Sequence, residues 1–279
     1  MSFKPVANNE QSVHEQIVEC FESIRDWMKV NKLKLNEDKT EYMLIGRSNN
    51  LEKTSIHSVK VGTADVLQKQ SVRNLGVMFD SHMDMEAQVN SICKSCYYHL
   101  RNIRGIRKYL SQKATESIVH ALISSRLDYC NSLLYGISSR LMKRLQIVQN
   151  TAAKVITGNA RYEHVTPILF TLHWLPVEYR VQYKLLLLTY KAYTDQAPLY
   201  IKELLQPYVP NRSELRSSNK CLLKVPKSNL VSCGNRCFSF VAPKLWNSLP
   251  MEIKYSKSLD SFKSALKTFL FGKAYSHFV

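Results

Sequence analysis

The sequence has no long apolar run. No stretch approaches the roughly 20 consecutive apolar residues that a membrane-spanning helix needs, so we expect no membrane partner. The N-terminal segment contains Glu10, Glu15 and Glu19 and no apolar core, so we expect no signal peptide. These absences predict an intracellular protein, in the nucleus or the cytoplasm, that is not secreted.

The sequence also lacks the residue patterns of common metal and small-molecule sites. It has only eight glycines, and they form no phosphate-binding loop. Cys221, Cys233 and Cys237 do not have zinc-knuckle spacing, and the histidines form no pair at helical spacing. The seven cysteines, an odd number without a secretory signal, indicate free thiols in a reducing compartment. We therefore expect no metal site, no cofactor and no small-molecule substrate in this chain.

Positive charge is in excess, and it is concentrated in two segments. The chain has 39 Lys and Arg against 22 Asp and Glu, a net charge of +17. Residues 1–83 are balanced, with 11 basic and 11 acidic residues, whereas residues 84–160 have 11 basic and four acidic, and residues 211–279 have 12 basic and three acidic. A solvated surface is the ordinary explanation, but charge localised in blocks favours a polyanionic partner.

The N-terminal part is predicted to contain one helix and a small antiparallel sheet. Residues 12–30 have apolar residues at steps of three and four, which predicts an amphipathic helix. Short apolar segments at 42–45, 56–61 and 72–79 are predicted strands, with turns near Gly62 and Gly76.

The next predicted helix, residues 81–108 with Ser81 as its N-cap, carries both an apolar and a basic stripe. The apolar stripe consists of Met85, Val89, Ile92, Cys93, Cys96, Leu100 and Ile103. Its Cys-x-x-Cys pair is better explained by burial in the core than by a redox or zinc site. Arg101, Arg104 and Lys108 share another face, with Arg107 beside them, and this face is suited to phosphates. A solvated last turn favoured by the helix dipole accounts for part of this charge.

Further helices are predicted over 112–135 after the N-cap Ser111, from Ser139, from Val177, and over 259–271. The helix from Ser139 has an apolar stripe, and Arg140, Lys143, Arg144 and Lys154 lie off it. Arg180 is predicted to be a surface residue, and residues 238–241 and 243–250 are predicted to be separate short apolar segments.

Together these elements predict an α+β, mostly α-helical fold, in which a small antiparallel sheet near the N-terminus is followed by a helical bundle and a basic C-terminal region. The predicted domains are residues 1–83, 84–160 and 161–279, the last with a linker near 207–220, where Pro, Asn, Arg and Ser are frequent.

Several segments resemble the reverse transcriptase of non-LTR (long interspersed, jockey-like) retrotransposons. Residues 31–41, Asn-x-Leu-x-Leu-Asn-x-x-Lys-Thr-Glu, resemble the segment that follows the catalytic Asp pair of that family. Residues 74–77, Asn-Leu-Gly-Val, resemble the turn that grips the primer end. Residues 125–150 and 238–271 extend the resemblance over nearly the whole chain.

The resemblance implies the C-terminal part of an RNA-directed DNA polymerase: the end of the palm at 1–83, a thumb-like bundle at 84–160 and the C-terminal region. It implies RNA and DNA, as template and primer, for partners, and Mg²⁺ for the full-length family. Lys39 matches a lysine that contacts the leaving pyrophosphate in that family. The residues expected to bind nucleic acid, from this resemblance and from the charge, are Leu75, Gly76, Arg101, Arg104, Arg107, Lys108, Arg140, Lys143 and Arg144.

The catalytic carboxylates of that family are missing from the sequence. None of the eight Asp residues is adjacent to another, and no aromatic-x-Asp-Asp motif occurs. Because nucleotidyl transfer uses two metal ions held by carboxylates, we expect the chain alone to be inactive, as a fragment of a longer reading frame. One alternative is a stand-alone helical nucleic-acid-binding protein derived from such an element. Another is a helical scaffold that binds acidic proteins or an anionic membrane surface.

Overall fold

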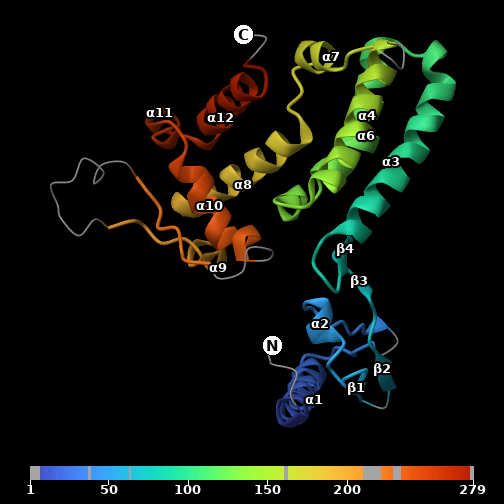
Figure 1. The fold of residues 1–279 in the computed structure, drawn as a ribbon, viewed down its shortest axis with the longest axis vertical. Coiled ribbons are helices and arrows are strands. Elements are labelled where there is room, and N and C mark those ends of the chain that lie inside the picture. The colour runs from blue at the N-terminus through green and yellow to red at the C-terminus, as the bar shows by residue number, and fades with distance from the viewer. Residues whose placement is uncertain are drawn as a thin grey trace. The chain divides into compact units, whose positions relative to one another are not determined.

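The computed structural model describes residues 7–36, 39–62, 64–159, 163–209, 221–228 and 234–276 (Figure 1). The predicted fold class is confirmed: the structure is 61% helical, with two small antiparallel sheets near the N-terminus followed by helices. The chain forms two compact units that divide between Ser91 and Ile92. Most of the linker predicted near 207–220 lies outside the described residues.

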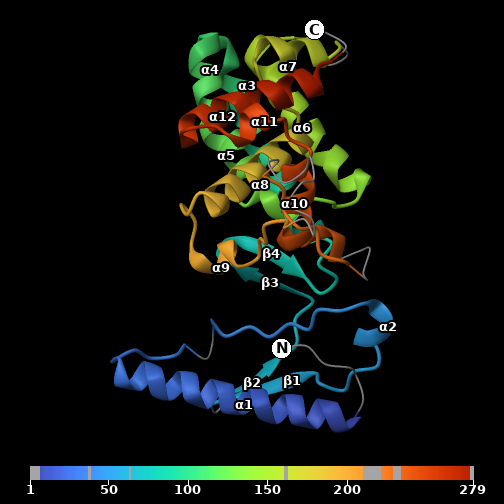
Figure 2. The same cartoon turned by 90° about the vertical axis from the view of Figure 1, so that its left-hand side faces the viewer.

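The N-terminal unit has one long helix packed on a two-stranded hairpin. Its elements are α1 (Ala7–Val30), α2 (Ser48–Leu51), β1 (Ser58–Val61), β2 (Ala64–Leu67), β3 (Ser71–Asn74) and β4 (Val77–Asp80). β1 pairs with β2 and β3 with β4, both antiparallel. Val13 of α1 is buried against the hairpin residues Val59, Val61 and Val66 and against Ile56 just before β1, which places α1 along β1 and β2 (Figure 2).

The turn predicted near Gly76 is confirmed, and one predicted strand is wrong. Residues 72–79 form a hairpin of two strands, because Leu75 and Gly76 both have positive φ, 46° and 82°, and reverse the chain between β3 and β4. In residues 42–45 only Tyr42 pairs, in one isolated bridge with Gln68. The sequence does not predict β2, because residues 64–67, Ala-Asp-Val-Leu, do not alternate between apolar and polar. Only Val66 of the four is buried.

The C-terminal unit is helical. Its helices are α3 (Glu86–Ile106, which begins in the N-terminal unit), α4 (Gln112–Val119), α5 (Ser125–Asp128), α6 (Ser139–Thr157), α7 (Thr166–Thr171), α8 (Val177–Tyr193), α9 (Leu199–Lys202), α10 (Phe238–Asn247), α11 (Met251–Lys254) and α12 (Leu259–Ala274). Ser111 caps α4 as predicted, since its side chain accepts a hydrogen bond from the Ala114 amide. The cap of α6 is Ser138, one residue before the predicted start.

Helix α3 begins later than predicted. Ser81 is buried, and its hydroxyl donates to Gln70 at 3.1 Å, so it does not cap the helix. Met85 has a positive φ of 66°, which no residue within a right-handed helix adopts. The helix therefore begins at Glu86, whose amide donates to the Asp84 carboxylate at 2.8 Å. The predicted apolar stripe is buried along its whole length.

The helix predicted over 112–135 is divided into shorter segments. Its inward residues Thr115, Val119, Ile123 and Leu127 repeat every four positions, more slowly than the 3.6-residue turn of an α-helix. A π-helical segment at 120–124 widens the helix and keeps these residues on one side. The chain then leaves the helix, because Cys130 has a left-handed φ of 50°.

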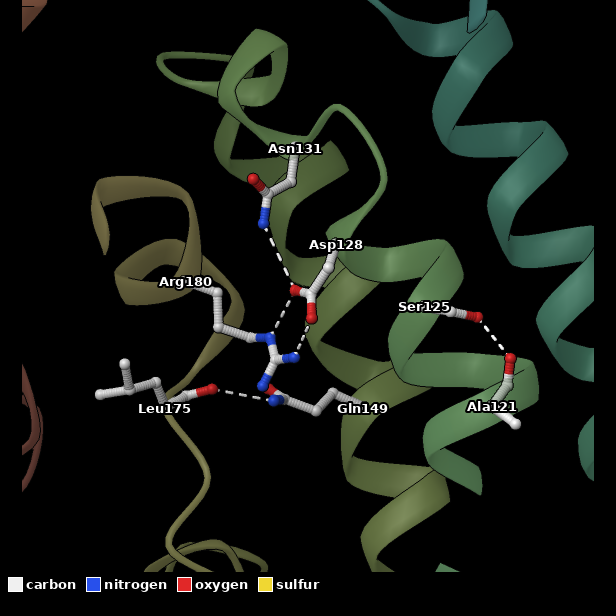
Figure 3. Close-up of polar contacts among 7 residues, drawn as sticks. All are labelled: Ala121, Ser125, Asp128, Asn131, Gln149, Leu175 and Arg180. Atoms are coloured by element: carbon white, nitrogen blue, oxygen red, sulfur yellow. Dashed lines mark hydrogen bonds and ion pairs between the residues drawn. The ribbon is translucent and has the colours of Figure 1, made fainter. Parts of the chain in front are cut away.

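A polar cluster joins α8 to the segments before it (Figure 3). The Arg180 guanidinium donates from Nε to Asp128 at 2.8 Å and from Nη2 to the second oxygen of the same carboxylate. Gln149 Nε2 donates to the Leu175 carbonyl at 2.8 Å. The prediction that Arg180 is a surface residue is wrong, because only 19% of its side chain is exposed. No local pattern identified Asp128 as its partner, 52 residues away.

The segments predicted as separate at 238–241 and 243–250 form, up to Asn247, one helix, α10. Pro243 lies inside it and removes one backbone donor, which is why the sequence predicts a break. Packing outweighs that loss, since Trp246 is fully buried and its Nε1 donates to the Cys221 carbonyl at 2.8 Å. α10 and α12 pack on α8 and form a core with Leu186, Tyr190, Trp246, Phe262, Leu266 and Leu270.

Both cysteines of the Cys-x-x-Cys pair are buried and unbridged, as predicted. Burial raises the pKa of Cys96 to about 12 and also raises the pKa of Cys93. Since the thiolate is the reactive form, we expect native protein at pH 8 to label slowly at both residues and rapidly at the exposed Cys20 and Cys237. Mass spectrometry of a labelling time course measures this, and native labelling of Cys93 and Cys96 at the rate of Cys20 would contradict it.

Candidate nucleic-acid interface

One face of α3 presents basic and aromatic side chains. Tyr97, Arg101 and Arg104 follow one another at steps of four and three, so they lie on the same side of the helix. All three are exposed, whereas Leu100 and Ile103 between them are buried. The core therefore fixes the rotation of α3, and this rotation turns the two arginines outward together.

A second helix faces these residues across a groove. The walls of this groove are α3 and α6, which run side by side (Figure 1), and the volume of the groove is about 890 Å³. The lining residues are Tyr97, Leu100, Arg101, Arg104, Arg107, Ile147, Asn150, Thr151, Lys154, Val155, Gly158 and Asn159. We call it the α3–α6 groove. Residues 147, 151 and 154 are again spaced by four and three, so α6 turns one face to it.

The α3–α6 groove is electropositive. Arg101, Arg104, Arg107 and Lys154 line it, and none of the described lining residues is acidic. Arg144 lies near its Tyr97 end: burial raises the pKa of the Tyr97 hydroxyl, and the Arg144 guanidinium opposes that rise. Cations from two helices around one concave surface favour an anionic ligand.

Arg107 also holds the groove together. Its guanidinium donates from Nε to the Val155 carbonyl at 2.9 Å and from Nη2 to the Ile156 carbonyl at 2.8 Å. Nη1 donates to the Leu110 carbonyl at 2.8 Å. Carbonyls at a helix C-terminus have no partner within the helix, so Arg107 satisfies two carbonyls of α6 and ties the ends of α3 and α6 together. Three of its five N–H groups are engaged in this way.

The other predicted basic residues lie outside the groove. The Lys108 ammonium lies 4.8 Å from the centre of the Tyr109 ring. Arg140 is exposed at the start of α6. Lys143 lines a separate depression of about 470 Å³ together with Tyr135, Glu178 and Tyr179.

The remaining predicted residues belong to the N-terminal unit. Leu75 and Gly76 form the turn between β3 and β4, and Leu75 is 86% exposed at its tip. Lys39 is exposed, and its amide donates to the Asn36 side chain at 3.2 Å. The structure thus brings Arg101, Arg104 and Arg107 into one site, with Arg144 near its Tyr97 end. It places Lys39, Leu75 and Gly76 in the other unit.

Sequence reasoning did not identify Tyr97 and Ile147 as parts of this site, and it placed Lys154 off the apolar stripe of its helix without assigning it to the site. Tyr97 precedes Arg101 by one helical turn, so the spacing already placed it on the basic face. Nothing in the sequence indicated that α6 faces α3, and the contribution of Ile147 and Lys154 depends on that packing.

The described residues contain no group of three or more His, Cys, Asp or Glu side chains that could hold a metal ion. None of the helices in the described part is long and apolar enough to cross a bilayer. No protein-family model, no curated protein and no solved structure matches this chain.

Proposed function

We propose that this chain binds nucleic acid through the α3–α6 groove, as the C-terminal part of a non-LTR retrotransposon reverse transcriptase. The observation that carries the proposal is the pair Arg101 and Arg104, exposed side by side in a groove whose described lining has no acidic residue. Phosphate binding needs positive charges along one path, and the neighbouring turns of α3 supply them. The resemblance at residues 31–41 and 74–77 supports the identification of the polymerase family.

Within this function the α3–α6 groove acts as the thumb surface that contacts the nucleic acid. Arg101 and Arg104 contact phosphates, and Arg107 fixes the width between the two walls by holding the C-terminus of α6. Such contacts position a strand without reading its sequence, so we expect similar affinity for different sequences.

Fluorescence anisotropy with a labelled RNA template annealed to a shorter DNA primer tests the proposal on the full chain. Saturable binding at low salt that weakens as salt rises is the expected result. Absence of binding at low salt would refute the proposed function.

We expect the isolated chain not to polymerise. Its sequence has no adjacent Asp pair, whereas nucleotidyl transfer uses two metal ions held by carboxylates. Primer extension with an RNA template, Mg²⁺ and deoxynucleotides should give no product above a boiled control. Template-dependent extension by the pure protein would contradict this expectation.

A further inference from the structure

The α3–α6 groove combines its cations with exposed apolar surface. Tyr97 on α3 is 44% exposed, and Ile147 on α6 is 45% exposed. Both line the groove, together with the buried residues Leu100 and Val155. A surface that contacted phosphates alone would have no use for a half-exposed aromatic ring and an aliphatic side chain beside its arginines.

These apolar groups indicate whether the groove binds single-stranded or double-stranded nucleic acid. A double helix keeps its base faces stacked inside and offers phosphates and groove edges to a protein. A single strand exposes its base faces, which stack on aromatic side chains while the backbone follows a positively charged groove. The half-exposed Tyr97 and Ile147 therefore favour a single strand as the ligand of the groove.

The spacing of Tyr97, Arg101 and Arg104 along α3 fits a single strand of nucleic acid. Tyr97 and Arg101 are separated by about 6 Å along the helix axis, and Arg104 follows about 4.5 Å further, from the rise of 1.5 Å per residue. The aromatic ring therefore lies at one end of the arginine pair, where a base and the phosphates that follow it can be bound together.

We propose that the α3–α6 groove binds a single-stranded segment of nucleic acid, with one base stacked on Tyr97 beside Ile147 and the adjoining phosphates on Arg101 and Arg104. This rests on the proposed function and names the form of the ligand: the unpaired part of a template, and not its duplex. Tyr97 is a specificity residue in this account, because it contacts the base and leaves phosphate binding to the arginines.

The test measures binding of the full chain to a fluorescein-labelled oligouridylate by anisotropy. Unlabelled competitors are an abasic oligomer of equal length and a blunt RNA–DNA duplex. The variants are Tyr97→Ala, Tyr97→Phe and the double variant Arg101→Ala/Arg104→Ala. Tyr98→Ala is the matched control, because Tyr98 is the next residue of α3, is 64% exposed and does not line the groove.

We expect Tyr97→Ala to weaken oligouridylate binding by roughly 5- to 150-fold, the effect of losing one base–aromatic stack. Tyr97→Phe keeps the ring and should bind within about twofold of wild type, as should Tyr98→Ala. The abasic oligomer should bind wild type weakly and should not respond to Tyr97→Ala. The blunt duplex should compete poorly.

Two failures are distinguishable. If Tyr97→Ala binds oligouridylate as well as wild type while Arg101→Ala/Arg104→Ala binds weakly, the single-strand inference is overturned and the proposed function remains. If wild type binds neither oligouridylate nor the primed RNA template at low salt, the proposed function itself fails. Circular dichroism verifies the fold of Tyr97→Ala. Should that variant lose helix, the wild-type comparison between oligouridylate and the abasic oligomer decides, and equal affinity would overturn the inference.

Discussion

Replacing Arg101 and Arg104 together with alanine is expected to weaken binding of a primed RNA template roughly 25- to 60-fold at 0.1 M salt. Each lost phosphate contact reduces the steepness of log K against log salt by about 0.7–0.9. Because 0.1 M lies one logarithmic unit below 1 M, each lost contact also lowers log K at 0.1 M by about 0.7–0.9. Both side chains are exposed on α3, so the substitutions should leave the fold unchanged. Anisotropy at fixed salt measures the loss.

The matched control is the double variant Lys29→Ala/Lys34→Ala. Both lysines are exposed and lie in residues 1–83, whose charge is balanced. It removes the same charge and should lose little affinity, because it removes no groove contact. If the control loses as much affinity as Arg101→Ala/Arg104→Ala, binding follows net charge alone and the groove has no special role.

Arg107→Ala is expected to destabilise the C-terminal unit by about 2–4 kcal/mol, because three charge-assisted hydrogen bonds to carbonyls are lost. Two of those carbonyls, of Val155 and Ile156, belong to α6, so the contact between the ends of α3 and α6 is lost as well. Arg107→Lys should not restore stability, since an ammonium lacks the planar fork that reaches several carbonyls. Urea unfolding followed by circular dichroism measures the change.

Arg104→Ala serves as the comparison for stability. It removes the neighbouring exposed arginine of the same groove, and we expect it to change the free energy of unfolding by less than about 0.5 kcal/mol. Equal destabilisation by Arg104→Ala and Arg107→Ala would show that the hydrogen bonds of Arg107 to α6 contribute nothing to the free energy of unfolding. The two arginines, three residues apart, thus separate a structural role from a binding role.

The sequence predicted those features that depend on spacing within one helix. On α3, the buried positions Cys93, Cys96 and Leu100 and the exposed positions Arg101 and Arg104 followed directly from steps of three and four. The cap Ser111 is equally local, since its side chain bonds an amide three residues later.

The rest depends on contacts between residues far apart in the sequence. Arg107 bonds carbonyls 48 and 49 residues away, and Arg180 bonds Asp128 52 residues away, so neither role has a local pattern. The groove itself exists because α6 packs beside α3, which no spacing within either helix reveals. Helix α10 includes Pro243, a residue that disfavours helix, because burial of Trp246 outweighs the lost donor.

The most direct measurement of the central claim is the salt dependence of binding, in which wild type and Arg101→Ala/Arg104→Ala are titrated with the primed RNA template across a salt series. We predict that log K falls linearly with log salt for wild type and that the double variant reduces the slope by about 1.4–1.8. Polyglutamate of equal charge represents an acidic protein partner. It should bind more weakly than the template, and its affinity should be the same for wild type and for the double variant. An unchanged slope in the double variant, or binding of polyglutamate as tight as that of the template, would contradict nucleic-acid binding by the α3–α6 groove.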